Sequence, residues 1–261
     1  MILRVFTALT LLAFAFSGAR AAAQIQLLEK EADKIGRKVW RNECGGTIEG
    51  LTSWNSGENF ASLGIGHFIW YPKGVHGPFE ESFPKLVAFL KSRGAKLPGW
   101  LSAETECPWP ARSDFLRDTN SARMKELRGM LAGTLHLQTE FLVQRLENAL
   151  PKMLDAAPPA ERDKVRTQFH RVLQSVGAGA YALIDYVNFK GEGVLETERY
   201  QGQGWGLLQV LESMSGNGAP VRDFSRSAQA VLTRRVQNAP TARHEERWLP
   251  GWKSRVAGYA E

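Results

Sequence analysis

Three glutamates lie close together near the start of the chain, in a segment rich in glycine and aromatic residues. Glu43, Glu49 and Glu58 all fall between Trp40 and Tyr71. Cleavage of a glycosidic bond uses carboxyl groups, of which one donates a proton while another stabilises charge or activates water. The segment therefore predicts glycosidase chemistry, with carboxyl groups facing each other across a groove.

An amphipathic helix is expected immediately before these glutamates. Apolar residues recur every three or four positions over residues 24–42, and Gly45 and Gly46 end the pattern. Glu43 then lies in the last turn of the helix. The negative end of the helix dipole disfavours an ionised carboxylate there and helps the side chain to keep its proton. Glu43 is therefore the first candidate for a general acid.

A small sheet is expected over residues 51–70. Turn residues at Asn55-Ser56-Gly57, and the glycines at 64 and 66, separate short apolar runs. The aromatic residues of this stretch are typical of a core, of platforms on which sugar rings stack, or of both.

Most of the remaining chain is expected to be helical. Residues 72–112 predict a long ordered loop with one short helix, and a Gly/aromatic loop from Tyr200 to Val210 opens another helix and is typical of a groove lining. Periodic apolar patterns predict helices over residues 83–93, 121–132, 135–154, 159–175, 181–190 and 223–237. The polar Asp185, Asn188, Lys190 and Gln203 are not easily explained by helix packing alone.

The first 23 residues have the layout of a secretory signal peptide. Arg4 precedes an apolar run from Val5 to Phe16, and small residues flank Arg20. The run is too short to span a bilayer comfortably, so no membrane segment is expected after cleavage. Loss of the two arginines lowers the formal net charge from +6 to +4. This modest excess suits an anionic cell wall, and without a dense Lys/Arg stripe it does not indicate nucleic acid.

The chain has two cysteines, Cys44 and Cys107. In an oxidising compartment a disulfide between them would add roughly 4 kcal/mol of stability, and the alternative is a pair of buried free thiols. The sequence leaves both open. No Cys/His cluster has the spacing of metal ligands, so neither a metal nor a cofactor is expected.

Several motifs resemble those of phage-type lysozymes. Glu43 followed by Ser62-Leu63-Gly64-Ile65-Gly66-His67 is similar to the catalytic glutamate and the Thr-x-Gly-x-Gly-His hairpin of that family. The segment 182–185 looks like its central buried helix, and Arg247-Trp248 with Arg255-Val256 is similar to its C-terminal helices. The motifs occur in the family's order, but nothing in residues 73–175 matches it.

The resemblance implies an α+β, mainly α, lysozyme-like fold with a small β hairpin at the cleft and a helical lobe. After a signal peptide at 1–23, residues 24–72 would form the catalytic helix and hairpin, 73–175 an insertion and helical scaffold, and 176–261 a helical lobe that closes the cleft. The expected partner is the glycan strand of peptidoglycan, in the periplasm or outside the cell.

The resemblance also implies roles for the carboxylates. Glu43 would protonate the glycosidic oxygen, while Glu58 would stay ionised and act on the oxocarbenium charge or on a water held by Ser62. The family usually has an aspartate where this chain has Ser56, and Glu58 lies two residues later. The sequence Glu49-Gly50-Leu51 also looks like the start of the family's hairpin, which leaves Glu49 as an alternative acid.

A set of polar and aromatic side chains is expected to contact the glycan, with His67 mainly bracing the hairpin: Trp54, Asn55, His67, Trp70, Asn188, Gln203 and Trp205. Three alternatives to a muramidase-like hydrolase remain. A lytic transglycosylase would use Glu43 alone, and an inactive wall-binding protein would explain the missing aspartate. A chitosanase-like enzyme is disfavoured because the net charge of +4 would repel a cationic glycan.

Overall fold

The structure, a computed structural model, describes residues 25, 27 and 29–261, so the predicted signal peptide lies outside the described residues. Helices predominate and the strands are short and antiparallel. The prediction of an α+β, mainly α fold is therefore confirmed. Among the residues that the structure describes, no helix has the length and apolar character needed to cross a membrane.

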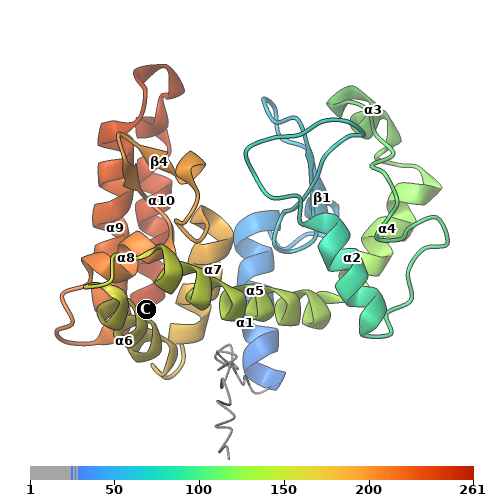
Figure 1. Ribbon diagram of the computed structural model, residues 1–261. Coiled ribbons are helices and arrows are strands. Elements are labelled where there is room, and N and C mark those ends of the chain that lie inside the picture. The colour runs from blue at the N-terminus through green and yellow to red at the C-terminus, as the bar shows by residue number, and fades with distance from the viewer. Residues whose placement is uncertain (1–24, 26, 28) are drawn as a thin grey trace, which may run out of the picture.

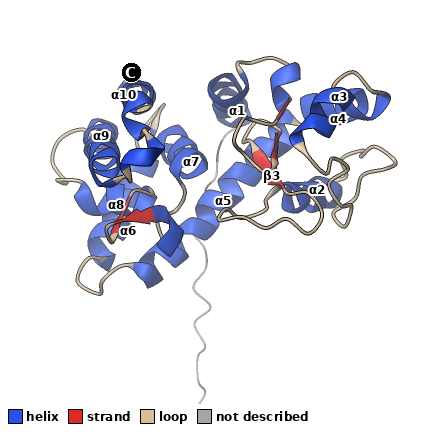
Figure 2. Ribbon diagram, turned by 90° about the horizontal axis from the view of Figure 1, so that it is seen from above, coloured by secondary structure: helices blue, strands red, loops and turns tan. Residues whose placement is uncertain are grey.

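The helices gather in two groups joined by a long central helix (Figures 1 and 2). One group surrounds the small sheet and contains α2 (Phe83–Ser92), α3 (Arg112–Asp118) and α4 (Ala122–Gly133). The other contains α6 (Arg162–Leu173), α7 (Gly179–Lys190), α8 (Leu207–Ser213), α9 (Pro220–Asn238) and α10 (Leu249–Ala257). The central helix α5 (Leu135–Ala156) packs against α2, α6, α7 and the first helix, α1 (Glu29–Cys44).

Helix α1 packs very closely on α5 because a glycine lies at their contact. A Cβ atom at Gly36 would lie 2.2 Å from Oγ1 of Thr139, so only glycine fits there. Ile35 and Val39 bury the same face of the helix. After Cys44 the helix ends at two glycines with positive φ, as the sequence predicts. Glu43 is thereby placed in the last turn of a helix that α5 holds firmly.

The predicted sheet is present, with three strands in the order β1 (Thr52–Ser53), β2 (Ala61–Leu63) and β3 (Phe68–Trp70). Ser62 pairs with Ser53 on one side and with Ile69 on the other. The turn after β2 is fixed to α5, because the Gln138 side chain accepts a 2.9 Å hydrogen bond from the Ile65 amide. The hairpin and the end of α1 are thus held by the same helix.

An aromatic core lies behind the sheet. The Trp70 ring is 4.8 Å from Phe83 and 6.0 Å from Trp109, and Trp109 is 4.9 Å from Phe115. The loop over residues 72–112 packs over this core, with a bridge between Pro72 and Cys107. Burial of these large rings supplies much of the hydrophobic stabilisation of this half of the molecule.

Most predicted helices coincide with observed ones to within a few residues: α2, α4, α5, α6, α7 and α9. Helix α3 and the two-stranded β4 (Arg199–Tyr200) and β5 (Gln203–Gly204) pair were not predicted. Strands of two residues are too short to show an alternating pattern. Helix α6 packs with α7 and α8, although the sequence assigned it to the scaffold region before residue 176.

Candidate active site around Glu43

Glu43 is contacted by residues from three other elements. Arg255 of α10 donates to its Oε1, and Asn188 of α7 donates to the same oxygen at 3.4 Å. Nδ1 of His67, at the end of the turn between β2 and β3, lies 3.4 Å from Oε2. The Glu43 side chain is 13% exposed. The carboxylate therefore lies where the hairpin, α7 and α10 meet α1.

Arg255 is itself held by a buried carboxylate. Its Nε and Nη2 each donate a 2.8 Å hydrogen bond to one oxygen of Asp185, whose side chain has no exposed surface. Burial opposes the charge of Arg255, but the hydrogen bonds and charges of Asp185 and Glu43 outweigh it and raise the Arg255 pKa. A two-point contact of this kind fixes the plane of the guanidinium. Arg255 is therefore a rigid, permanently charged support for Glu43.

Two tyrosines and an asparagine complete the surroundings of Asp185. The Tyr259 hydroxyl donates to it at 2.6 Å, and Asn42 lies 3.4 Å from its Oδ1 and donates to the Tyr181 hydroxyl at 2.7 Å. Burial, followed by the charge of Asp185, raises the pKa of Tyr181 to about 12 and that of Tyr259 well above its usual value. Both hydroxyls therefore stay protonated at physiological pH.

The hairpin reaches Glu43 through strained and closely packed backbone. His67 has φ 49°, an uncommon value for a residue other than glycine. A Cβ atom at Gly66 would lie 3.0 Å from Oδ1 of Asn188, so the absence of a side chain lets the turn approach α7. The structure thus brings the predicted site residues His67 and Asn188 together with Glu43.

The other predicted carboxylates have different environments. Glu58 lies in the loop between β1 and β2, where its carboxylate accepts a 3.1 Å hydrogen bond from Asn55. Glu49 begins a short 3₁₀ helix, η1 (Glu49–Leu51), and is exposed. A general acid benefits from a rigid and partly buried position, which Glu43 has and Glu49 lacks.

Ser62, expected to hold a water, is only 3% exposed in the central strand. Such burial leaves its hydroxyl little access to solvent. Gln203, a predicted glycan contact, is exposed in β5.

Burial corrects the assignment of three tryptophans to glycan binding. Trp54, Trp70 and Trp205 are 5%, 2% and 6% exposed. Trp54 and Trp70 belong to the aromatic core, and Trp205 lies 4.5 Å from Tyr200 and 4.1 Å from the Arg235 guanidinium. None presents a free face on which a sugar ring could stack.

Cys44 and Cys107 are free and buried, so the disulfide alternative is wrong and the alternative of two buried thiols holds. Cys44 donates to the Gly64 carbonyl at 3.4 Å and Cys107 to that of Trp109 at 3.7 Å. Burial raises the pKa of Cys44 to about 12 and that of Cys107 to about 11. Both side chains are inert thiols in the folded protein.

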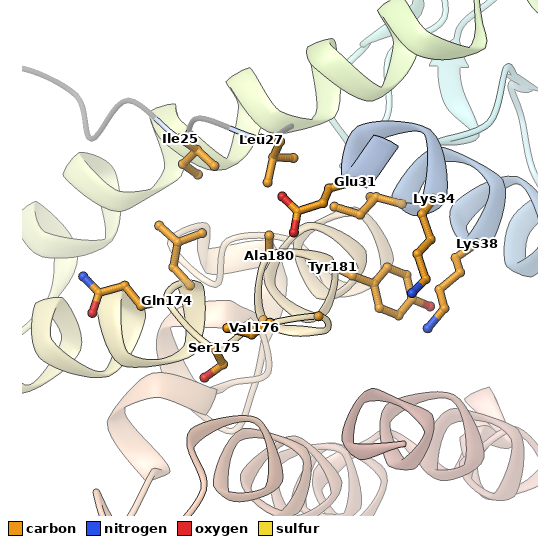
Figure 3. Close-up of a pocket in the computed structure, with 14 residues that line it drawn as sticks. Ile25, Leu27, Glu31, Lys34, Lys38, Gln174, Ser175, Val176, Ala180 and Tyr181 are labelled. Atoms are coloured by element: carbon orange, nitrogen blue, oxygen red, sulfur yellow. The ribbon is translucent and has the colours of Figure 1, made fainter. Parts of the chain in front are cut away.

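Two hollows lie near this region. One of about 390 Å³ opens between α1 and the turn from α6 to α7, where Lys34 and Lys38 of α1 face Val176 and Tyr181 (Figure 3). The other, of about 500 Å³, is lined by Asn42, which precedes Glu43 in the chain, and by Arg255, which donates to Glu43. Within the described part of the chain, no group of His, Cys, Asp and Glu side chains is arranged to hold a metal ion.

Sequence reasoning did not find the pairing of Asp185, Arg255 and Tyr259. Its signal was an aspartate inside an otherwise apolar helix, which demands a buried partner.

Comparisons of the chain with protein-family models, with curated proteins and with solved structures found no match. The functional argument therefore depends on the geometry around Glu43.

Proposed function

We propose that this protein cleaves glycosidic bonds in the glycan strands of peptidoglycan, with Glu43 as the proton donor. The observation that carries the proposal is the fixed carboxylate at the end of α1. Arg255, Asn188 and His67 contact it from three separate elements, and Asp185 locks the arginine in place.

The two oxygens of Glu43 differ in a way that suits proton transfer. Oε1 is occupied by Arg255 and Asn188, whereas the nearest contact of Oε2 is the His67 ring at 3.4 Å. Oε2 is therefore the oxygen from which a proton would pass to the glycosidic oxygen, while Arg255 on Oε1 favours the carboxylate that remains. The carboxylate left behind, stabilised by Arg255, can then remove a proton from the attacking nucleophile.

Hydrolysis of the muramidase kind needs a second carboxylate, and Glu58 is the candidate that follows from the resemblance to phage-type lysozymes. Glu58 would stay ionised and stabilise the oxocarbenium charge or activate a water. Export to the periplasm or the cell exterior, where the predicted signal peptide would lead the chain, suits this substrate.

A lytic transglycosylase is the second candidate, and one observation favours it. Asp185 is buried and fully bonded, and the Glu58 carboxylate is already bound by Asn55. Glu43 is then the single acid/base, and a hydroxyl of the sugar itself serves as the nucleophile.

The proposal is tested by release of soluble muropeptides from purified sacculi, with the chain lacking residues 1–23. We expect Glu43→Gln to abolish release, because the amide cannot donate the proton. Glu49→Gln is the matched control and should leave release unchanged. Mass spectrometry of the products distinguishes a reducing end, made by a hydrolase, from an anhydro end, made by a transglycosylase.

The Glu58→Gln variant separates the two mechanisms further. A large loss of release supports hydrolysis with two carboxylates, and an unchanged rate supports Glu43 acting alone. If the wild-type chain binds sacculi but releases nothing over a range of pH and salt, the enzyme proposal fails and an inactive wall-binding protein takes its place.

A further inference from the structure

Lys190, at the end of α7, is a cation held between aromatic rings. Its Nζ lies 3.4 Å from the centre of the Trp252 ring and 4.0 Å from that of Phe189. Among the described residues, no carboxylate lies within ion-pair distance of it. Cation–π contacts stabilise the charge in part, but within the described part of the chain no group accepts a hydrogen bond from the ammonium group.

Two arginines share the same rings, and both have carboxylate partners. The Arg255 guanidinium lies 4.1 Å from the centre of the Phe189 ring and binds Asp185 and Glu43. The Arg235 guanidinium lies 4.9 Å from that of Trp252 and binds Glu245 through two hydrogen bonds. Lys190 is thus the one cation of this set whose charge is not balanced by a carboxylate in contact with it.

The environment of Lys190 disfavours its charge. Burial, followed by the charge of Arg235 on α9, lowers the Lys190 pKa well below its usual value. Arg255 on α10 acts in the same direction, while Glu245, in the turn before α10, and Glu43 on α1 oppose it only in part. A bound anion would supply the missing negative charge and restore the proton.

The position is close to the candidate active site. Asn188, two residues earlier on α7, donates to Glu43, and Arg255 joins Glu43 to the Phe189 ring that Lys190 covers. Asn188 and Phe189, the two residues before Lys190, therefore contact Glu43 directly or through Arg255.

We propose that Lys190, framed by Phe189 and Trp252, binds a carboxylate of the glycan strand beside the bond that Glu43 cleaves. The inference rests on the proposed function and names the feature of the substrate that the site selects. Peptidoglycan carries carboxylates on the lactyl group of muramic acid and on the stem peptide, whereas chitin has none. Lys190 therefore makes the enzyme selective for peptidoglycan over uncharged glycans.

Calorimetric titration of the Glu43→Gln chain, which binds without turnover, tests the inference with three tetrasaccharides. They are chitotetraose, the alternating N-acetylglucosamine and N-acetylmuramic acid tetrasaccharide, and the same glycan with its stem peptides. We expect the carboxylate-bearing glycans to bind about tenfold or more tightly than chitotetraose, as a charge-assisted hydrogen bond predicts. Tight binding without peptides identifies the lactyl carboxylate, and tight binding only with them identifies the stem peptide.

Adding Lys190→Met should abolish this selectivity and leave chitotetraose binding unchanged, because methionine keeps the length of the side chain between the rings. Lys190→Arg keeps the charge and should keep the selectivity. The matched control is Lys91→Met, which removes the same charge from the exposed face of α2 and should change nothing.

Proton uptake gives a second readout. A carboxylate raises the lowered pKa of Lys190, so binding takes up a proton at pH values between the free and the bound pKa. The heat of binding should then depend on the ionisation enthalpy of the buffer in the Glu43→Gln chain. That dependence should disappear with Lys190→Met and with Lys190→Arg, whose guanidinium stays charged throughout.

Equal affinity for all three glycans, or selectivity that persists with Lys190→Met, overturns the inference. If wild type still releases muropeptides in that case, the proposed function stands without it. If no glycan binds and no muropeptide is released, both the inference and the proposed function fail.

Discussion

At the scale of single residues, Asp185 is a charged group whose burial costs free energy unless it is paired. It is a fully buried aspartate on an apolar helix, and three donors satisfy it: Arg255, Tyr259 and Asn42. A buried ion pair contributes little net stability compared with apolar packing, but loss of one partner leaves an uncompensated charge. The pair is best explained by its effect on position, since it aims Arg255 at Glu43.

This arrangement predicts a large effect of Arg255→Met. The variant leaves Asp185 buried without its counter-ion, and we expect the free energy of unfolding to fall by about 3–5 kcal/mol. Urea unfolding measures the loss. Lys253→Met, on the same helix, is the control and should cost well under about 1 kcal/mol. An equally small effect of Arg255→Met would show that Asp185 is satisfied without it.

At the scale of elements, the turn between β2 and β3 positions His67. Gly64 has φ 70°, and a Cβ atom there would lie 2.5 Å from Oε1 of Gln138, the atom that accepts the Ile65 amide. Glycine is therefore needed at position 64 for two reasons: the backbone has a positive φ, and Gln138 leaves no room for a Cβ atom.

The two requirements can be separated with a matched pair of variants. Gly57 also has positive φ, but nothing lies within 4 Å of its Cβ position. We expect Gly57→Ala to cost about 1 kcal/mol through backbone strain alone, and Gly64→Ala to cost about 1–3 kcal/mol more by overpacking against Gln138. Thermal unfolding gives both values. If the two variants lose the same stability, the close contact of Gly64 with Gln138 does not affect the free energy of unfolding.

The same elements show how far sequence reasoning reaches. Helices with one apolar face, such as α5 and α9, were predicted to within a few residues because their period of 3.6 persists over several turns. The end of α1 was predicted because its two glycines are a local signal. Aromatic composition alone could not distinguish the core position of Trp70 from a sugar platform, since burial depends on residues distant in sequence.

The same limit applies to the candidate site. Glu43 and His67 could be named from motifs, and Asn188 as a polar residue that helix packing did not explain. The pairing of Asp185 with Arg255 joins positions 70 residues apart. No periodic pattern in the sequence shows which arginine pairs with a buried aspartate. Lys190 was visible as an unexplained polar residue, while its unbalanced charge depends on the two arginines that share its rings.

At the scale of the whole molecule, net charge predicts how the chain finds its substrate. Without residues 1–23 the formal charge is +4. We expect binding of the Glu43→Gln chain to anionic sacculi to weaken as salt rises from about 0.01 to about 1 M, because the Debye length falls from about 30 to about 3 Å.

Co-sedimentation at each salt concentration measures the bound fraction. Uncharged chitin particles are the control, and binding to them should depend little on salt. Binding to sacculi that does not change over this range would mean that long-range attraction has no part in recognition.

The pairing of Glu43 with Arg255 joins residues 212 positions apart, from the first helix to the last. A ribosome synthesises the chain from its N-terminus, so Glu43 is made long before Arg255. Every partly made chain that lacks the last helix therefore carries Glu43 without Arg255. On the proposed function, Glu43 gains the support that the chemistry needs last, at the step when the final helix docks.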